Sequence, residues 1–269
     1  MFKSSLVIST ADAGFDALAF KGDFEEGIEL AKKLGYDAVE IAIRDPDLVD
    51  WSLLKKILEK EQMPVSAIGT GQAFLVEGLS LSSNNENIRK KAIERIKKHV
   101  KFATFIGGLV IIGLIRGFWK NDEGTKEKLK ASIKEIGEFA KSEGVNIVIE
   151  PLNRYECDNL NTVEEVLKFI EEIGLSNIGV LADTFHMNIE EPSIETSIRK
   201  AGKKLFHFHV ADSNRWAPGS GHIDFKSIFE TLKEIDYNGY ISVECLPLPN
   251  GEEEAARMAL KTIRDCWIP

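Results

Sequence analysis

The chain has 269 residues, of which 43% are hydrophobic and 29% are charged, and its formal net charge at pH 7 is −9. This length can bury an ample core, in one large domain or two small ones. The acidic balance argues against a nucleic-acid partner, because affinity for the phosphate backbone depends mainly on lysine and arginine.

Cysteine usage and the N-terminus indicate the compartment. The cysteines are odd in number and lack CxxC spacing, which argues against a disulfide framework or a zinc ribbon: Cys157, Cys245 and Cys266. The first apolar run is very short and is followed by Asp12 and Asp16, so it predicts a strand rather than a signal peptide. No run approaches the roughly 20 apolar residues of a membrane helix. We therefore expect a soluble, cytoplasmic protein without a membrane partner.

Strands and helices alternate through the first half of the chain. After a strand over residues 2–9, a helix is predicted between Asp23 as its N-cap and Gly35 as its stop. Further strands are expected over 37–43, 64–69, 109–112 and 145–150, with helices over 51–58, 84–106 and 126–142. Apolar residues in the helix over 84–106 repeat as in a helix packed on a sheet, and His99 is expected on its exposed, charged face.

The alternation continues without a linker to the C-terminus. Thr162 and Glu165 fit a capping box that opens a helix ending at Ile173. Strands follow over 177–183, 204–210 and 240–244, and helices over 193–201, 224–235 and 252–265. Eight βα units predict an α/β fold, a single (β/α)8 TIM barrel domain over residues 1–269, with a doubly wound open sheet as the alternative. In such a barrel the active site lies at the C-terminal ends of the strands.

Four consecutive predicted strands carry a potential metal ligand near this end. The first is the apolar run Val145–Ile149, which ends in Glu150 because Pro151 cannot continue the ladder. The next three strands supply Asp183, His209 and Glu244. Each alone could be an ordinary residue at a strand end. Together, three carboxylates and an imidazole suit a hard or borderline divalent ion, which would neutralise their charge.

Other histidines lie close to these positions. His186 follows Asp183 by three residues, where it can contact a bound ligand or cap the next helix. His207 and His209 share one face of their strand because side chains alternate with period two. We expect His209 to be the metal ligand because it is nearer the C-terminal end, and His207 to pack or to support it.

These residues lie in motifs that resemble the D-tagatose 3-epimerase group of the xylose-isomerase-like sugar isomerase and epimerase superfamily. The motifs are Glu150-Pro151-Leu152-Asn153-Arg154-Tyr155-Glu156, Asp183-Thr184-Phe185-His186, residues 207–215 with Pro218-Gly219-Ser220-Gly221, and Glu244. They are ordered over the C-terminal half, and the eight βα units extend the resemblance in outline to the whole chain.

The resemblance implies a function and a set of roles. A single Mn²⁺-type ion, with Co²⁺ or Mg²⁺ as alternatives, would bind Glu150, Asp183, His209 and Glu244, while Glu156, His186 and Arg215 contact the sugar. The ion would polarise a ketone and stabilise an enediolate. Glu150 and Glu244 would then act as proton acceptor and donor on opposite sides of the neighbouring carbon, which inverts it. A homo-oligomer, dimer or tetramer, is also expected.

Relatives in the same superfamily supply alternatives. Endonuclease IV-type enzymes use a three-zinc cluster with additional histidines, which residues 66–71 lack, and xylose isomerase uses two metals and a longer chain. Hydroxypyruvate isomerase and inosose dehydratase cannot be separated by the four ligands. A non-catalytic sugar-binding protein that keeps the metal is a further alternative.

The substrate is expected to be a small ketose or a keto-sugar acid such as a 5-ketogluconate. The acid is suggested by arginines just past predicted strands, namely Arg44, Arg116 and Arg154, in addition to Arg215. An arginine fork suits a carboxylate. Alternatively, these arginines pair with the abundant carboxylates of the chain.

Overall fold

The computed structural model describes residues 2–120 and 122–266. The strands are β1 (Lys3–Thr10), β2 (Phe20–Gly22), β3 (Ala38–Ala42), β4 (Val65–Gly69), β5 (Leu109–Ile112), β6 (Ile147–Ile149), β7 (Ile178–Asp183), β8 (Leu205–Val210) and β9 (Tyr240–Val243). The helices are α1 (Phe24–Leu34), α2 (Trp51–Glu61), α3 (Gln72–Glu77), α4 (Glu86–Ile106), α5 (Glu123–Ser142), α6 (Val163–Ile173), α7 (Thr184–Glu190), α8 (Ile194–Ala201), α9 (Phe225–Glu234) and α10 (Glu252–Cys266). Short 3-10 helices lie at Pro46–Leu48, Leu114–Arg116 and Gly202–Lys204.

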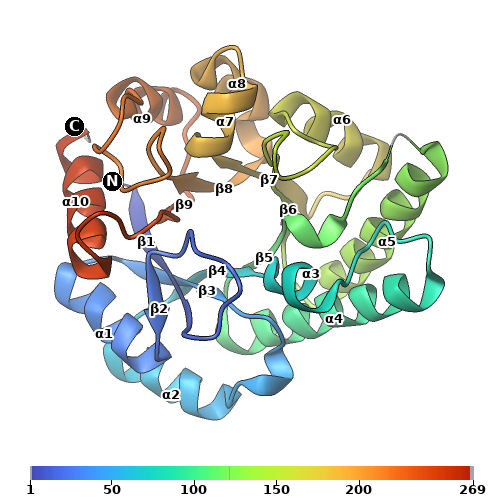
Figure 1. The fold of residues 1–269 in the computed structure, drawn as a ribbon, viewed down its shortest axis with the longest axis horizontal. Helices are drawn as coiled ribbons and strands as arrows, with labels where there is room; N and C mark the ends of the chain where they lie inside the picture. Colours follow the sequence, from blue (N-terminus) through green and yellow to red (C-terminus); the bar gives the residue numbers. More distant parts are fainter. Residues whose placement is uncertain (1, 121, 267–269) are drawn as a thin grey trace.

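The strands form a closed parallel barrel. Their order is β1-β3-β4-β5-β6-β7-β8-β9, and β9 pairs back onto β1 through Lys3 and Tyr240. β2 adds to the C-terminal part of β1 outside this ring. Helices surround the strands (Figure 1). The predicted TIM barrel is therefore confirmed, and closure of the ring excludes the doubly wound open sheet.

Local signals in the sequence account for the helix boundaries. The Asp23 side chain accepts a hydrogen bond from the Glu25 amide at the start of α1, and Gly35 ends the helix with a φ of 90°. Thr162 and Glu165 form the reciprocal capping box of α6. The sequence did not predict β2, α3 or α7, because segments of this length cannot show an amphipathic repeat.

The prediction that His99 lies on the surface was wrong. The side chain is fully buried, and its ring nitrogens lie 2.8 Å from the Arg95 carbonyl oxygen and 3.2 Å from that of Ile43. His99 is three residues after Ile96 and four before Ala103, both of which are buried in α4. This spacing places it on the apolar face of the helix despite its polarity.

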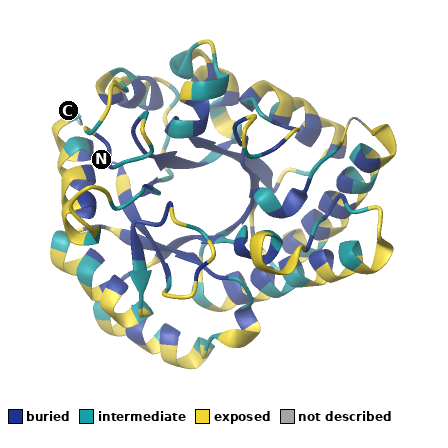
Figure 2. Ribbon diagram, in the orientation of Figure 1, coloured by how far each residue is buried: buried dark blue, intermediate teal, exposed yellow. Residues whose placement is uncertain are grey.

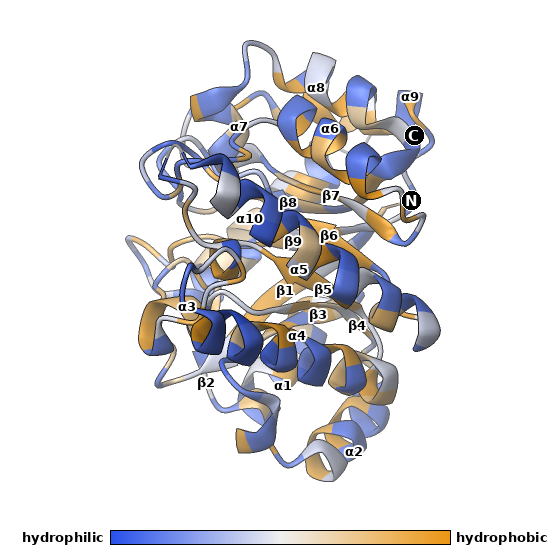
Figure 3. Ribbon diagram, turned by 90° about the vertical axis from the view of Figure 1, so that its right-hand side faces the viewer, coloured by the Kyte–Doolittle hydropathy of each residue, from blue (hydrophilic) through white to orange (hydrophobic). Residues whose placement is uncertain are grey.

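Burial follows the two layers of the barrel. The strands are almost entirely buried, and the helices expose their outer faces (Figure 2). Seen from the side, hydrophilic and hydrophobic residues alternate around the helices, as expected for helices that cover a sheet (Figure 3). Within residues 2–120 and 122–266, no helix combines the length and apolar character that a membrane span requires.

The interior of the barrel holds both an apolar cluster and polar contacts. Ala67, Ile111, Val148 and Leu181 form a separate buried cluster on β4 to β7. In addition, Ser5 on β1 hydrogen-bonds Ser66 on β4, and Glu40 on β3 hydrogen-bonds His207 on β8.

These strand pairs are not adjacent in the sheet, so the two contacts cross the barrel interior. Of these four polar residues, Glu40 also lines the pocket described next.

Candidate active site

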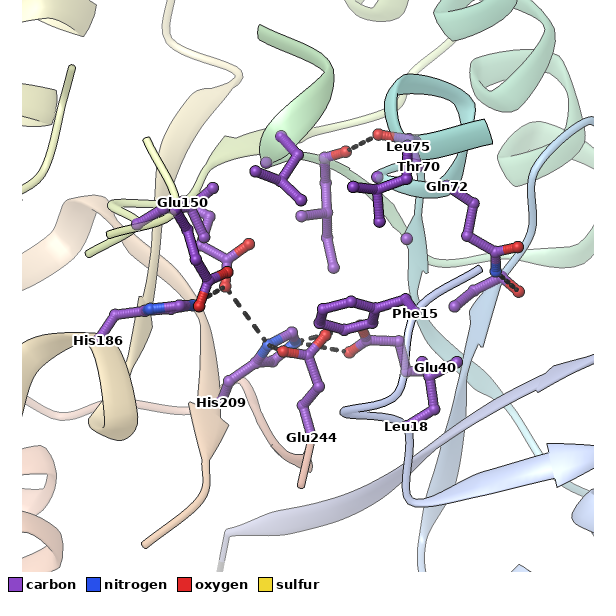
Figure 4. A pocket seen from close by; sticks show the side chains of 18 of the residues that line it. Phe15, Leu18, Glu40, Thr70, Gln72, Leu75, Glu150, His186, His209 and Glu244 are labelled. Carbon is purple, nitrogen blue, oxygen red and sulfur yellow. Dashed lines mark hydrogen bonds and ion pairs between the residues drawn. The ribbon is translucent and has the colours of Figure 1, made fainter. Parts of the chain in front are cut away.

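Four predicted side chains converge at the C-terminal ends of β6 to β9. Glu150 directly follows β6, Asp183 ends β7, His209 lies next to the last residue of β8, and Glu244 directly follows β9. One potential ligand atom from each lies within 4.8 Å of the others. The strands are neighbours in the sheet, so their ends bring the four residues together. Figure 4 shows Glu150, His209 and Glu244 facing the same pocket.

Three of these side chains carry a buried polar atom without a hydrogen-bond partner. The atoms are Glu150 Oε1, Asp183 Oδ2 and His209 Nδ1. His209 Nδ1 lies 3.8 Å from Glu150 Oε1 and 3.6 Å from Glu244 Oε2. Buried polar atoms in proteins almost always have a partner. A divalent cation among these atoms would supply one, so the donor set fits a metal ion.

The charges of the cluster support the same interpretation. Burial, together with the Glu244 carboxylate, raises the pKa of Glu150 well above its usual range. The same two causes raise the pKa of Asp183 to about 6. Without a cation, crowded carboxylates therefore retain protons. A bound cation would replace those protons.

A glycine at the end of β5 makes room for Glu150. A Cβ atom on Gly113 would lie 2.9 Å from Glu150 Oε2, closer than real Cβ contacts allow. A larger residue at this position would make the Glu150 carboxylate shift. Glycine therefore allows the close approach of this carboxylate.

Arg116 contacts both ends of the loop that follows β6. It is fully buried, and its guanidinium donates to the carbonyl oxygens of Glu150, Gly113 and Leu160 and to both side-chain and backbone oxygens of Asn159. The shortest contact, 2.7 Å, reaches the Glu150 carbonyl oxygen. Arg116 thus ties the end of β6 to the end of the loop that follows it. Its donors are occupied by protein oxygens, so it does not supply the predicted carboxylate fork.

The other two arginines of that prediction are also paired within the protein. Arg154 contacts the Glu190 carboxylate at 2.8 Å, and Arg44 lies 3.7 Å from Glu77 and 3.9 Å from Asp12. The alternative, pairing with protein carboxylates, is thus the outcome for both. Of the four predicted arginines, Arg215 alone lines the pocket.

We expect Arg116→Met to lower the free energy of unfolding by about 3–5 kcal/mol, because it leaves several buried carbonyl oxygens without donors. Arg154→Met is the matched control. Its side chain is 61% exposed, so loss of its ion pair should cost about 1 kcal/mol or less. Denaturant unfolding of both variants measures the difference. Equal losses would show that Arg116 is not the clamp described above.

The four-residue cluster forms one wall of a pocket of about 590 Å³, including its open mouth. Glu156, His186 and Arg215, the residues predicted to contact substrate, also line it. The large apolar residues of its lining are Phe15, Leu18, Leu75, Leu114 and Leu152.

Asn153 orients two of these residues. Its side-chain amide donates to His186 Nδ1 at 2.8 Å and to Glu156 Oε1 at 2.9 Å. Because Nδ1 of His186 accepts, a neutral ring carries its proton on Nε2, which has no other partner and lies 3.9 Å from Glu150 Oε1. Burial, and then the Arg215 charge, lower the pKa of His186 well below its usual range. His186 is thus a neutral donor aimed at the pocket.

Arg215 is held on three sides. Its Nη1 donates to Glu156 Oε1 at 2.7 Å, and its guanidinium lies over the rings of Phe185 and Phe15 at 4.8 and 5.1 Å. Its backbone has a φ of 62°, a left-handed conformation that is uncommon outside glycine. Such conformations concentrate at functional sites. Nε of Arg215 is buried without a partner and remains available to a ligand.

Sequence reasoning missed two residues that support the site. Asn153 lies three residues before Glu156 in the motif of residues 150–156, which could have indicated that it contacts this carboxylate. Glu40 is a carboxylate within the otherwise apolar run of residues 38–42, an unusual feature that could have indicated a functional role. It is 1% exposed and contacts both His207 and His209.

Comparisons with known proteins agree with this geometry. Residues 28–266 match the family model described as a xylose isomerase-like TIM barrel. An L-ribulose 3-epimerase of Methylomonas sp. (strain DH-1) is 32% identical over 86% of this chain and 83% of its own length. A D-psicose 3-epimerase of Ruminiclostridium cellulolyticum is 34% identical over 84% and 79%.

Comparison with solved structures also identifies a sugar 3-epimerase as a similar protein. A crystal structure of D-allulose 3-epimerase from Methylomonas sp. superposes with a TM-score of 0.85 at 28% identity, covering 98% of this chain and 99% of that one. The chain therefore belongs to the xylose isomerase-like TIM-barrel family, in which its relatives include ketose 3-epimerases.

Proposed function

We propose that this protein is a carbohydrate epimerase that inverts the carbon next to the ketone of a sugar. The observation that carries the proposal is the convergence of Glu150, Asp183, His209 and Glu244 beside three substrate-facing groups in one pocket. The ketose 3-epimerases among its relatives support it. The proposed unit is the single barrel domain, with the reaction at the C-terminal ends of its strands.

The four converging residues are proposed to hold one divalent ion. Mn²⁺ is the preferred choice, with Co²⁺ or Mg²⁺ as alternatives, because three carboxylates and one imidazole form a mixed hard and borderline donor set. When bound, such an ion polarises the ketone and stabilises the negative charge left by proton removal.

Glu150 and Glu244 are proposed to move the proton. Their carboxylates reach the pocket from separate strand ends, and both lie within 4 Å of His209 Nδ1 (Figure 4). If one glutamate removes the proton and the other returns one from the opposite face, the carbon inverts.

Glu156, His186 and Arg215 are proposed to bind the oxygens of the sugar. His186 offers a neutral N–H donor, Arg215 offers a cationic donor, and Glu156 accepts. The two donors also favour negative charge on the ketone oxygen as the proton leaves. Asn153 and the two phenylalanines around Arg215 keep these groups in place.

A ketose is the proposed substrate. The three arginines that suggested a keto-sugar acid are paired within the protein, so a carboxylate would depend on Arg215. Arg215 already pairs with Glu156. Matched kcat/KM values for a neutral ketose and its sugar acid test the choice, and a clear preference for the acid would reverse it.

NMR analysis of the products tests the reaction type. The Mn²⁺-loaded protein is incubated in D₂O with ketoses, keto-sugar acids, hydroxypyruvate and inosose. We expect an epimer with deuterium at the carbon next to the ketone. An aldose would instead indicate an isomerase, and an unsaturated or deoxy product a dehydratase. Metal and sugar binding without proton exchange would indicate a binding protein.

Removal of Arg215 or His186 should separate metal binding from substrate binding. We expect Arg215→Ala and His186→Ala to retain the metal but to lose roughly 10- to 100-fold in kcat/KM, the usual range for losing a charged or buried hydrogen bond. Metal analysis and steady-state kinetics measure the two effects. Loss of metal in both variants would contradict the division of roles.

A homo-oligomer acting in the cytoplasm is proposed as its state in the cell. Exposed apolar side chains at the C-terminal end of the barrel support assembly, namely Leu75, Val76, Tyr155 and Leu248. Size-exclusion chromatography with light scattering measures the state in solution.

A further inference from the structure

A buried carboxylate supports the candidate metal site from the barrel interior. Glu40 lies in the middle of β3, and its side chain is 1% exposed. Its Oε2 atom lies 2.8 Å from His207 Nε2 and 3.0 Å from His209 Nε2, and Oε1 lies 3.1 Å from the latter. Figure 4 shows Glu40 beside the His209 ring at the edge of the pocket.

The contact with Glu40 determines which ring nitrogen of His209 carries a proton and which one is left for the other three residues of the cluster. An ionised carboxylate can only accept hydrogen bonds, so Nε2 of His209 must carry a proton. In a neutral ring, the lone pair is then on Nδ1. This atom has no hydrogen-bond partner and faces the carboxylates of Glu150 and Glu244.

A second metal ion between Glu40, His207 and His209 is the alternative. These residues also offer three ligand atoms within 4.8 Å of one another. Ligands about 2.0–2.1 Å from a tetrahedral ion lie roughly 3.3 Å apart. The observed 2.8 and 3.0 Å are instead ordinary hydrogen-bond distances. His209 would also have to give up both ring protons to bind two ions.

We propose that Glu40 is a positioning residue that fixes His209 in the tautomer and orientation in which Nδ1 binds the divalent ion. His207 holds Glu40 in place by donating a second hydrogen bond to the same carboxylate. This inference rests on the proposed function, because it assigns a support to the proposed metal site.

The burial of Glu40 is consistent with this role. A buried carboxylate is costly unless donors surround it, and two imidazole N–H groups meet this need. A metal ion on Nδ1 would make the His209 N–H a stronger donor. Glu40, His209 and the ion would then form a carboxylate–histidine–metal chain. Partners of this kind typically affect metal affinity by 10- to 100-fold.

Glu40→Gln tests the proposal with nearly the same side-chain shape. Both carboxylate oxygens of Glu40 lie beside Nε2 of His209, at 3.0 and 3.1 Å, so the NH₂ group of the amide faces His209 in either orientation. There it favours a lone pair on Nε2 and a proton on Nδ1, which blocks the metal. We expect Mn²⁺ affinity, measured by competition with a chromophoric chelator, to fall roughly 10- to 100-fold. The visible spectrum of the Co²⁺-loaded variant should also change.

Ser66→Ala is the matched control. Ser66 is also buried, and it bonds Ser5 at 2.7 Å across the barrel and the Val39 carbonyl oxygen at 3.2 Å. Neither contact involves His209. We expect its Mn²⁺ affinity to stay within about twofold of the original protein, because these bonds do not orient a ligand.

The protein without substitutions provides an independent test in case Glu40→Gln does not fold. In ¹⁵N-histidine spectra of the Zn²⁺-loaded protein, His209 should be protonated on Nε2 and metal-bound through Nδ1. A metal on Nε2 would overturn the proposal. So would Glu40→Gln with Mn²⁺ affinity and Co²⁺ spectrum like those of the Ser66→Ala control.

Metal stoichiometry separates the remaining outcomes. Two ions per chain, one of them lost in Glu40→Gln, would replace the positioning role with a second metal site. An ion that survives Asp183→Asn with full affinity is not bound by the four-residue cluster, and this result would remove the proposed function as well. One ion that is lost in Asp183→Asn and weakened in Glu40→Gln supports both.

Discussion

Glu150→Gln and Glu244→Gln are each expected to lower turnover by roughly 10²- to 10⁴-fold, the range for loss of a positioned general acid or base. Glutamine keeps the size of the side chain but can neither take up nor return the proton. Glu138→Gln on the exposed face of α5 is the matched control and should keep full turnover.

Metal content must accompany these rates, because both residues are also proposed ligands. We would compare each variant at a metal concentration that saturates it, so that a lower rate reports the proton transfer. Undiminished turnover by metal-loaded Glu244→Gln would falsify the two-base scheme. The remaining single base would then favour an isomerase, which returns the proton to the neighbouring carbon.

Much of the site could be predicted because it depends on strand ends. In a parallel barrel the C-terminal ends of neighbouring strands meet, so Glu150, Asp183, His209 and Glu244 converge once their strands are recognised. Period two also placed His207 and His209 on one face, and both of their Nε2 atoms contact Glu40.

The missed features depend on contacts between distant segments. Glu40 and His207 are 167 residues apart in the chain, and no local pattern pairs them. Arg116 follows β5 as an active-site arginine could, but its five donors meet carbonyl and amide oxygens of neighbouring loops. Local spacing shows where a strand ends, whereas the direction of a long side chain depends on the packing around it.

Metal binding should raise thermal stability, and this gain should grow with pH. At a Mn²⁺ concentration about 100 times its dissociation constant, linkage predicts about 2.7 kcal/mol of added stability. For a chain of roughly this size, such a gain corresponds to a rise in Tm of about 5–10 °C. Asp183→Asn should lose most of it, because it removes a carboxylate from the centre of the cluster.

The pH dependence follows from the raised pKa values. In the metal-free folded protein, the pKa of Asp183 is about 6 and that of Glu150 is also raised, so both side chains hold protons. In the unfolded chain the same side chains have already released them. Between the ordinary carboxyl pKa and about 6, the folded state therefore binds more protons, and metal-free stability falls as pH rises. Burial lowers the pKa of His209, but the carboxylates of Glu40 and Glu244 outweigh this effect and raise the pKa well above its usual range. Metal-free stability therefore continues to fall at higher pH.

Metal ions compete with these protons, so their effect on stability has the opposite slope. At about pH 5 Mn²⁺ must displace the protons held by Asp183, Glu150 and His209, so it should raise Tm only slightly. At about pH 7.5 Asp183 has released its proton, so fewer protons must be displaced and the gain should be larger. Thermal unfolding of chelator-treated and Mn²⁺-loaded protein at both pH values measures the difference. An equal or larger gain at the lower pH would show that the ion does not bind to this set of carboxylates, since no protons would then be displaced when it binds.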